Sequence, residues 1–131
     1  MPYKMNEHHF ANVISMTSNE RLWNFVNKVA DWEQLWGARN DEGWLVPVTP
    51  EGIEYFPVWP HPDYAQKTTD QRFPGHRAEE IALDDFLYEW LPQLSNDDVK
   101  VAVFPNMDWA FWVIDAEDLA EYLEEEKSQY E

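Results

Sequence analysis

Cysteine is absent from this chain of 131 residues, and only four glycines occur in it. Without cysteine the protein has no disulfide, no thiolate metal site and no cysteine nucleophile. A phosphate-binding loop needs several glycines close together, so four in the whole chain disfavour one. The sequence also has no run of about eighteen apolar residues, the length that a membrane-spanning helix needs. We therefore expect no membrane span and none of the enzyme classes that depend on thiols or glycine-rich loops.

Positive charge is scarce as well. Nine Lys and Arg residues stand against 26 Asp and Glu residues, which gives a formal net charge of −17. Residues 1–60 carry −4 of it and residues 61–131 carry −13. A surface of this sign repels nucleic acids and anionic lipids, whose binding depends on Lys and Arg. We expect neither direct nucleic-acid binding nor membrane binding, and the acids either attract a basic protein partner or keep the protein soluble.

Aromatic residues, in contrast, make up 16% of the chain and include eight tryptophans. A disordered acidic chain would carry far fewer, so the protein is expected to fold, as one domain over residues 1–131. Its first ten residues, MPYKMNEHHF, have neither the apolar core nor the small-residue cleavage site of a secretory signal. The simplest interpretation is a cytoplasmic protein, a monomer or small homo-oligomer, that needs no cofactor.

Helices are predicted over residues 6–33, 63–69, 83–91 and 116–127. Apolar residues recur at helical spacing in the first, third and fourth of these regions. Thr17 and Glu20 have the spacing of a capping box, in which each side chain bonds the backbone N–H of the other residue. Pro92 is expected to stop or kink the third region, and Asp115 is expected to cap the fourth.

Strand patterns occur in two blocks, a three-stranded meander over residues 35–59 and a hairpin over residues 99–114. The meander is expected to have strands at 35–39, 44–48 and 53–58. Pro47 and Pro57 cannot donate to a ladder, so each is expected on an edge or at a bulge. Residues 70–80 are polar and are predicted to form an exposed connection. Because helices and strands come in blocks, we predict an α+β fold with a mainly antiparallel sheet and helices packed on one face.

The four histidines do not have the spacing of a known metal site. His8 and His9 would point about 100° apart on a helix and could not easily hold one ion. His61, Asp63 and His76 form the alternative set of ligands that a binding experiment would test. We expect no metal.

Carboxylate pairs occur along the chain, but residues adjacent in sequence need not converge in space. A catalytic pair needs an environment that pushes its two pKa values apart, and solvated acids at turns and helix starts do not have one. We therefore name no catalytic residue. An enzyme with an unrecognised site near Trp59 and His61 is kept as an alternative.

The aromatic residues provide the first candidate binding site. Eight tryptophans are more than a small core easily encloses with every indole N–H satisfied, so some are expected to line a cleft or interface. Our candidates are Trp59, His61 and Tyr64, with Trp36 and Trp44 from the preceding strands. Two prolines hold the backbone of this corner rigid. The alternative is that the corner only packs against the sheet.

The C-terminal helix provides the second candidate. Glu117, Glu121, Glu124 and Glu125 are predicted to share one face of it and to form an acidic patch. Such a patch could steer a basic protein partner to the surface, at a rate that depends on salt. The alternative is a solvated face without a partner.

Several motifs together resemble one known family. They are Arg21 with KVAD at 28–31, WG at 36–37, GW at 43–44, FPVWPHPDYA at 56–65, LDDFLYEWLPQL at 83–94 and VAVFP at 101–105. As a set they resemble the domain of unknown function 2750, a family of small bacterial proteins. The resemblance implies a compact α+β fold and supplies no catalytic residue.

The function most consistent with these features is that of a non-enzymatic binding or accessory protein. Its partner would be another protein, which the acidic surface predicts to be basic. A narrower alternative is an immunity-like inhibitor of a basic toxin or nuclease. The enzyme near Trp59 and His61 is the alternative from a different class.

Overall fold

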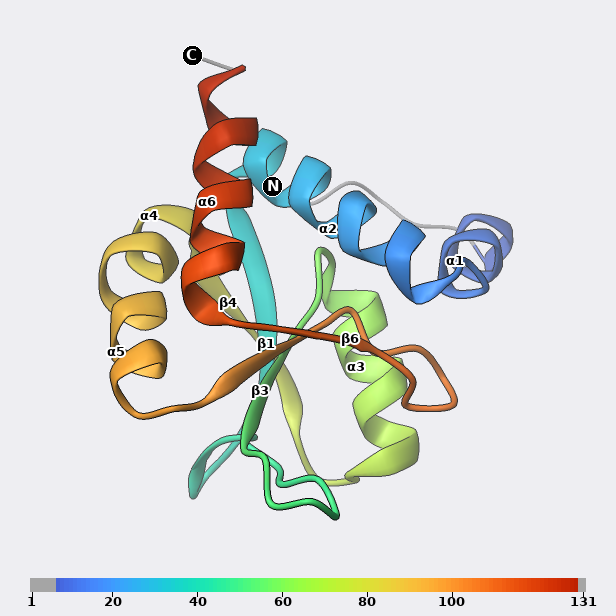
Figure 1. Cartoon of the computed structure of the whole chain (residues 1–131). Coiled ribbons are helices and arrows are strands. Elements are labelled where there is room, and N and C mark those ends of the chain that lie inside the picture. The colour runs from blue at the N-terminus through green and yellow to red at the C-terminus, as the bar shows by residue number, and fades with distance from the viewer. Residues whose placement is uncertain (1–6, 130–131) are drawn as a thin grey trace.

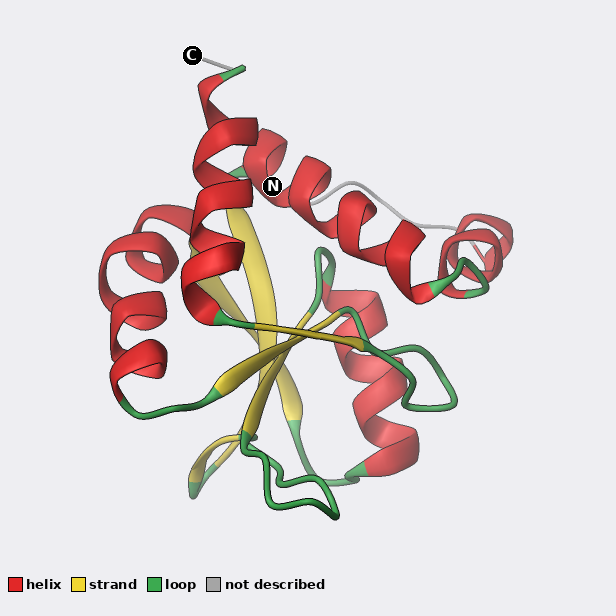
Figure 2. Ribbon diagram, viewed as in Figure 1, coloured by secondary structure: helices red, strands yellow, loops and turns green. Residues whose placement is uncertain are grey.

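The computed structural model of the chain describes residues 7–129 and contains two small sheets with helices packed around them (Figures 1 and 2). In chain order the elements are α1 (Glu7–Ile14), α2 (Ser18–Trp32), β1 (Gln34–Asn40), β2 (Gly43–Trp44), β3 (Tyr55–Val58), α3 (Pro62–Arg72), β4 (Arg77–Ala82), α4 (Leu83–Asp85), the π-helical turn η1 (Phe86–Trp90), α5 (Leu91–Asn96), β5 (Lys100–Val103), β6 (Trp112–Ile114) and α6 (Ala116–Ser128). The sheet orders are β2-β1-β4 and β3-β5-β6. The predicted α+β class with mainly antiparallel pairing is confirmed, since among the strands of residues 7–129 only the β3–β5 pair is parallel.

The capping box at the start of α2 is confirmed. The Thr17 hydroxyl accepts a hydrogen bond from the Glu20 N–H at 3.1 Å, and the Glu20 carboxylate accepts one from the Thr17 N–H at 3.0 Å. The helix ends at Glu33, whose backbone has φ 58° and whose N–H donates to the Val29 carbonyl. The apolar stripe of α2 is buried. The capping box therefore determines where this helix begins, and the packing of the stripe stabilises it.

The capping box predicts a dependence of stability on pH. Hydrogen bonds from the Thr17 backbone, and then from its side chain, lower the pKa of Glu20 below the ordinary 4.5. The stabilisation by this carboxylate is therefore complete above that value and is lost as the pH falls through the lowered pKa. We expect wild type to exceed Glu20→Gln in stability near neutral pH, and the difference to shrink in acid, as measured by urea unfolding. Glu51→Gln, in an exposed turn, is the control, and a difference that stays constant with pH would contradict the prediction.

The first sheet contains a strand that the sequence pattern did not predict. Residues 70–80 were expected to form an exposed connection, but β4 pairs antiparallel with β1 from Arg77 opposite Arg39 to Ala82 opposite Gln34. Only Ile81 of this strand is buried. An edge strand with one buried residue shows no apolar alternation, which explains why the prediction was wrong.

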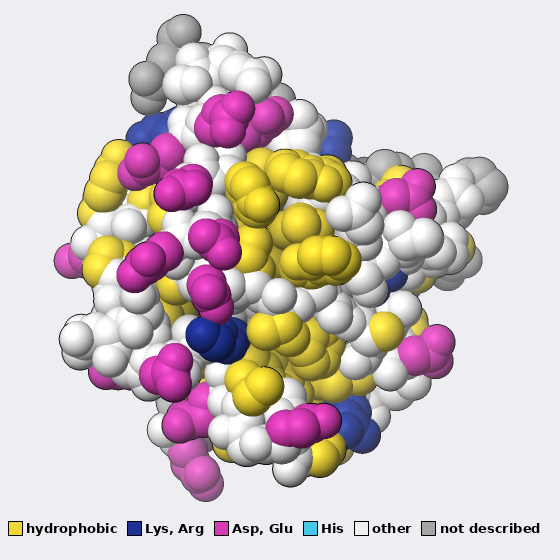
Figure 3. All heavy atoms as spheres, viewed as in Figure 1, with side chains coloured by type: hydrophobic (Ala, Val, Ile, Leu, Met, Phe, Trp, Pro, Cys, Tyr) yellow, Lys and Arg dark blue, Asp and Glu magenta, His cyan; other side chains and the backbone are white. Residues whose placement is uncertain are grey.

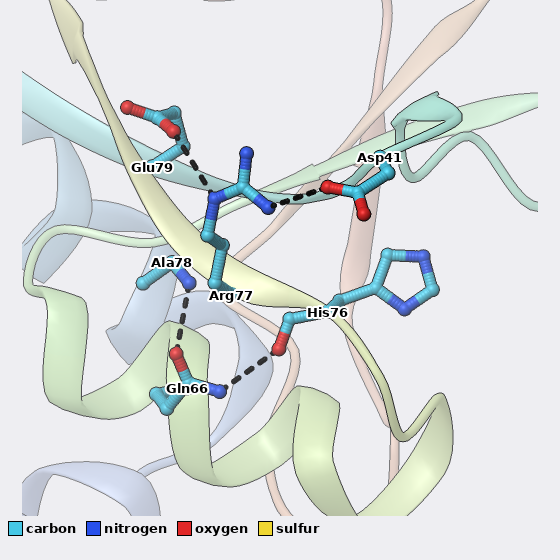
Figure 4. A network of polar contacts seen from close by, with 6 residues as sticks. All are labelled: Asp41, Gln66, His76, Arg77, Ala78 and Glu79. Carbon is cyan, nitrogen blue, oxygen red and sulfur yellow. Dashed lines mark hydrogen bonds and ion pairs between the residues drawn. The ribbon is translucent and has the colours of Figure 1, made fainter.

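The Gln66 side chain of α3 binds the start of β4 (Figure 4). Its amide nitrogen donates to the His76 carbonyl at 3.0 Å, and its amide oxygen accepts from the Ala78 N–H at 2.9 Å. Arg77 lies between Asp41 of the β1–β2 turn and Glu79 of its own strand, at 3.7 Å from each. The hydrogen bond with Gln66 satisfies the Ala78 N–H, which faces outward from this edge strand. An unsatisfied N–H there would be open to pairing with another chain.

The predicted three-stranded meander is wrong in its third strand. β1 and β2 form the expected hairpin, but β2 is only Gly43–Trp44 and so includes one residue of the predicted strand 44–48. β3 joins the second sheet, parallel to β5. The two sheets meet where Trp36 and Trp59 exchange backbone hydrogen bonds of 2.9 and 2.8 Å. Parallel pairing joins segments that are distant in sequence, so no local pattern encodes it. Pro57 lies in an edge strand, as predicted.

Pro92 distorts a helix without ending it. The segment predicted as 83–91 continues to Asn96, and residues Phe86–Trp90 form a π turn, after which the Leu91 N–H donates to the Phe86 carbonyl. The wider turn makes room for the proline ring, which would clash with the preceding turn of a regular α-helix. Pro92 then stands in the first turn of α5, where its missing N–H costs little.

The second predicted hairpin is confirmed as β5 and β6, which pair antiparallel from Val101 opposite Ile114 to Val103 opposite Trp112. The core lies between the sheets and the helices and contains the side chains of Trp59, Phe25, Phe56 and Phe104, none of them more than 1% exposed. α2 and α6 pack against each other and against the second sheet, and α3 packs against the first. Among the described residues, no helix is both long and apolar enough to cross a membrane.

Candidate functional site

The aromatic corner predicted from the sequence lies at the centre of the protein. Trp59 and Tyr64 are 0% exposed and His61 is 3% exposed. The Trp59 indole N–H donates to the Pro105 carbonyl at 3.0 Å, and His61 Nδ1 accepts from the Asp63 N–H at 3.1 Å, as the N-cap of α3. A ligand would reach these side chains only if the corner opened. Their proposed role in binding therefore stays a prediction. In the structure their contacts hold the start of α3 against the core.

Trp36 and Trp44, the other two members of that set, are partly buried. The Trp44 ring packs edge-on against Trp90 at 4.9 Å and against Phe56 at 5.9 Å. The Arg39 guanidinium lies 5.4 Å from the centre of the Trp44 ring. Trp44 is thus part of an aromatic cluster that joins the β1–β2 hairpin to the π turn.

The structure separates the alternative metal ligands. His61 precedes α3 and His76 follows it, so a helix of 11 residues, about 16 Å long, lies between them. His61 Nδ1 is 4.0 Å from the Asp63 carboxylate, and His76 Nδ1 is 2.9 Å from the Phe73 carbonyl. The side chains of His8 and His9 lie outside the described part of the protein. Within that part, no three His, Asp or Glu side chains are grouped as a metal site requires.

The predicted acidic patch is exposed along α6. Glu117, Glu121, Glu124 and Glu125 are all solvent-exposed, and Figure 3 shows Asp and Glu side chains following this helix across the face. We call these four residues the acidic row. Whether they bind a partner stays a prediction.

Asp115 stands at the N-cap of α6, but its side chain does not cap the helix as predicted. Instead its carboxylate accepts from Lys100 Nζ of β5 at 2.8 Å. The hydrogen bond and charge of Asp115, with a smaller contribution from Asp98, raise the pKa of Lys100. Sequence alone could not show this preference, because Lys100 comes from a strand fifteen residues earlier.

Sequence reasoning missed a second exposed surface next to the acidic row. Trp23 of α2 is 48% exposed, and Trp112 of β6 is 44% exposed. Tyr122 of α6 lies 5.1 Å from Trp23, ring centre to ring centre. α2, α6 and β6 pack together, and Figure 3 shows apolar side chains gathered beside the acids of α6. We call Trp23, Trp112 and Tyr122 the aromatic patch.

One signal in the sequence could have found the aromatic patch. Trp23 follows Leu22 directly, so it lies off the apolar stripe formed by Leu22, Phe25 and Val26. A large aromatic residue on the polar face of a helix is typical of a surface that another element or another protein covers. Tyr122 covers only part of Trp23.

Comparison with known proteins supports the family and adds no activity. The sequence profile described as protein of unknown function (DUF2750) matches residues 22–123. Neither a curated protein nor a solved structure matches the chain. The matched region begins in α2, ends in α6 and includes the three residues of the aromatic patch. The chain therefore belongs to the DUF2750 family, whose function is not known.

Proposed function

We propose that the protein is a non-enzymatic binding protein and that its partner is a basic protein that docks on the aromatic patch. The observation that carries this proposal is the exposure of Trp23 and Trp112, at 48% and 44%. Tryptophan and tyrosine dominate the binding energy of many interfaces. An exposed apolar surface bordered by charged residues is typical of a docking site.

The acidic row supports a basic partner in particular. It borders the aromatic patch on α6, the helix that also carries Tyr122. Carboxylates at the rim of an interface raise the rate of association with a basic protein and select against acidic ones. An immunity-like inhibitor of a basic toxin or nuclease is a narrower form of the same proposal. We place this binding in the cytoplasm, the compartment that the sequence favours.

The enzyme alternative has less support. A substrate would have to reach His61, which is 3% exposed, or Trp59, which is fully buried. A general acid or base must come within hydrogen-bonding distance of the atom it serves. We therefore adopt the binding protein as the conclusion.

The proposal is tested by capture of the partner from a lysate of the source cells with the tagged protein. Trp23→Gln combined with Trp112→Thr removes the two rings and keeps residues suited to a helix and a strand. We expect the captured amount of the partner to fall about tenfold or more, because interface tryptophans commonly contribute at least that factor. Conversion of the four acids of the row to Gln should weaken capture most at low salt.

The matched control removes apolar side chains elsewhere on the surface. Val48 and Ile53, 57% and 42% exposed, lie in the connection between β2 and β3. Val48→Ser with Ile53→Thr should leave capture unchanged. Capture that both tryptophan substitutions leave intact would overturn the proposal, as would recovery of only a second copy of this chain at either salt concentration.

A further inference from the structure

The helix pair α5 and α6 encloses a groove outside the aromatic patch. One hollow of about 370 Å³ has Leu87, Leu91 and Pro92 on one wall and Ala120 on the other. A second hollow, of about 210 Å³, lies at the start of α6. The two hollows share Ser95, Ala116 and Glu117, so they adjoin one another, and we call them together the α5–α6 groove.

The walls of the groove are tied together at two places. Lys127 Nζ of α6 lies 2.9 Å from the Asp84 carboxylate of α4. Where the two hollows adjoin, the Ser95 hydroxyl donates to Glu117 Oε1 at 3.0 Å. These contacts, and the packing of α5 on α6, hold the two helices apart at a set distance. A groove that exists before binding costs less ordering entropy when a ligand enters it.

The two parts of the groove differ in chemistry. The larger is lined mainly by aliphatic side chains, at the π turn that Pro92 requires, and π turns occur frequently at functional sites. The smaller is acidic, with four carboxylates and one ammonium group for a net charge of −3. Its ammonium group, Lys100, already pairs with two of the acids.

Two carboxylates of the acidic part can still accept from a ligand, since Ser95 occupies only Oε1 of Glu117. Glu117 and Asp118 are exposed, and among the residues that the structure describes neither forms an ion pair with Lys or Arg. Glu117 lines both hollows, so a cation bound to it would lie directly beside the aliphatic part. The charge and shape of the groove thus complement an apolar side chain with a cationic neighbour.

We propose that the α5–α6 groove binds a short peptide segment of a protein partner, in which an aliphatic side chain lies next to Lys or Arg. The aliphatic side chain would contact Leu91 and Ala120, and the cation would bind Glu117 and Asp118. This inference rests on the proposed function only in that the occupant belongs to a protein partner. It uses a different surface from the aromatic patch, and Glu117 is the one residue that the groove shares with the acidic row.

The probe is the pentapeptide Gly-Leu-Lys-Arg-Gly with blocked ends, titrated into the ¹⁵N-labelled full-length protein and followed by NMR. We expect the largest amide shifts in α5 and the first turns of α6. Replacing leucine with serine in the peptide should raise the dissociation constant about tenfold or more, since burial of leucine is worth at least that factor. Replacing the two cations with glutamine should also weaken binding, because charge-assisted hydrogen bonds to Glu117 are lost.

Three variants of the protein locate the two parts of the site. Ala120→Leu fills the aliphatic part with a residue that suits a helix, and should abolish the preference for leucine over serine. Glu117→Gln should raise the dissociation constant severalfold. Glu125→Gln makes the same change in charge on the same helix outside the groove, and should raise it less than Glu117→Gln does. The NMR spectrum of each variant shows whether it is folded.

The outcomes separate this inference from the proposed function. Equal effects of Glu117→Gln and Glu125→Gln, or an unchanged leucine preference in Ala120→Leu, would overturn the groove as the site. If the peptide causes no amide shift at low salt, the groove is not the site, even if the tryptophan substitutions abolish capture of the partner. Peptide binding in the groove together with capture that survives the tryptophan substitutions would support the groove and overturn the aromatic patch.

Discussion

Replacing Arg21 with Met should lower the free energy of unfolding by about 3–5 kcal/mol, a large part of the total stability of a small domain. Arg21 is 1% exposed and has no carboxylate partner among its described contacts. Its guanidinium donates to the carbonyls of Phe104 (2.8 Å), Ala110 (2.9 Å) and Met16, and to the Ser18 hydroxyl at 3.1 Å. Methionine fills similar space but removes the donor that Arg21 supplies to each of these carbonyls, of which the Ala110 carbonyl keeps a backbone donor, the Asn106 N–H at 3.0 Å.

The position of Arg21 explains the size of the expected effect. Its contacts join the α1–α2 connection and the start of α2 to the end of β5 and to the β5–β6 loop. Phe104 has φ 54°, a conformation that costs a bulky residue of order 1–3 kcal/mol. The hydrogen bond from Arg21 to its carbonyl helps to hold it there. Burial lowers the pKa of Arg21, because it takes the charged guanidinium out of water.

Urea unfolding of Arg21→Met, Arg21→Lys and Arg72→Met checks this prediction. Lysine cannot reproduce the planar fork of donors, so Arg21→Lys should also be strongly destabilised. Arg72 is an exposed arginine at the end of α3, and its replacement by Met should change the stability by no more than about 0.5 kcal/mol. Similar losses for Arg21→Met and Arg72→Met would contradict the structural role of Arg21.

Truncation of Trp59 should have an effect of similar size. Its side chain is fully buried, packs at 6.0 Å from Trp109 between ring centres and donates to the Pro105 carbonyl. Trp59→Ala should cost about 3–5 kcal/mol through the cavity that it leaves. Trp59→Phe should cost less, about 1–3 kcal/mol, because it keeps a ring but leaves the Pro105 carbonyl unsatisfied.

The same measurement distinguishes a packing role of the corner from a binding role alone. Trp112→Phe, at an exposed position of β6, is the control and should change the stability by no more than about 0.5 kcal/mol. If Trp59→Ala unfolds at nearly the same urea concentration as wild type, the corner does not hold the core together. Its candidacy as a binding site would then gain support.

Local patterns in the sequence predicted most of the helices correctly. The capping box of Thr17 and Glu20 and the apolar stripe after it are interactions within a few residues, so they form wherever the chain has this order. The hairpin of β5 and β6 likewise joins neighbours in sequence, and its β-branched and aromatic residues favour strands. The excess of acids is a property of composition alone.

Only the tertiary structure decided the placement of β3 and β4. β4 has one buried residue and is a strand because β1 supplies its hydrogen bonds and Gln66 binds its start. β3 pairs with β5, more than forty residues later, so its register depends on how the whole chain closes. Pairing strands so far apart in sequence closes a long loop and costs chain entropy. It therefore becomes favourable only when the rest of the core is in place.

The candidate surfaces divide in the same way. The spacing of the glutamates placed the acidic row on one face of a helix, because a single element determines which of its side chains lie together. The aromatic patch needs α2, β6 and α6, and the α5–α6 groove needs two helices and a π turn. The sequence by itself determined the charge, the class of fold and most helices, since these depend on composition and near neighbours. Which tryptophans are buried and which face solvent was decided only by tertiary packing, because burial depends on residues far away in the chain.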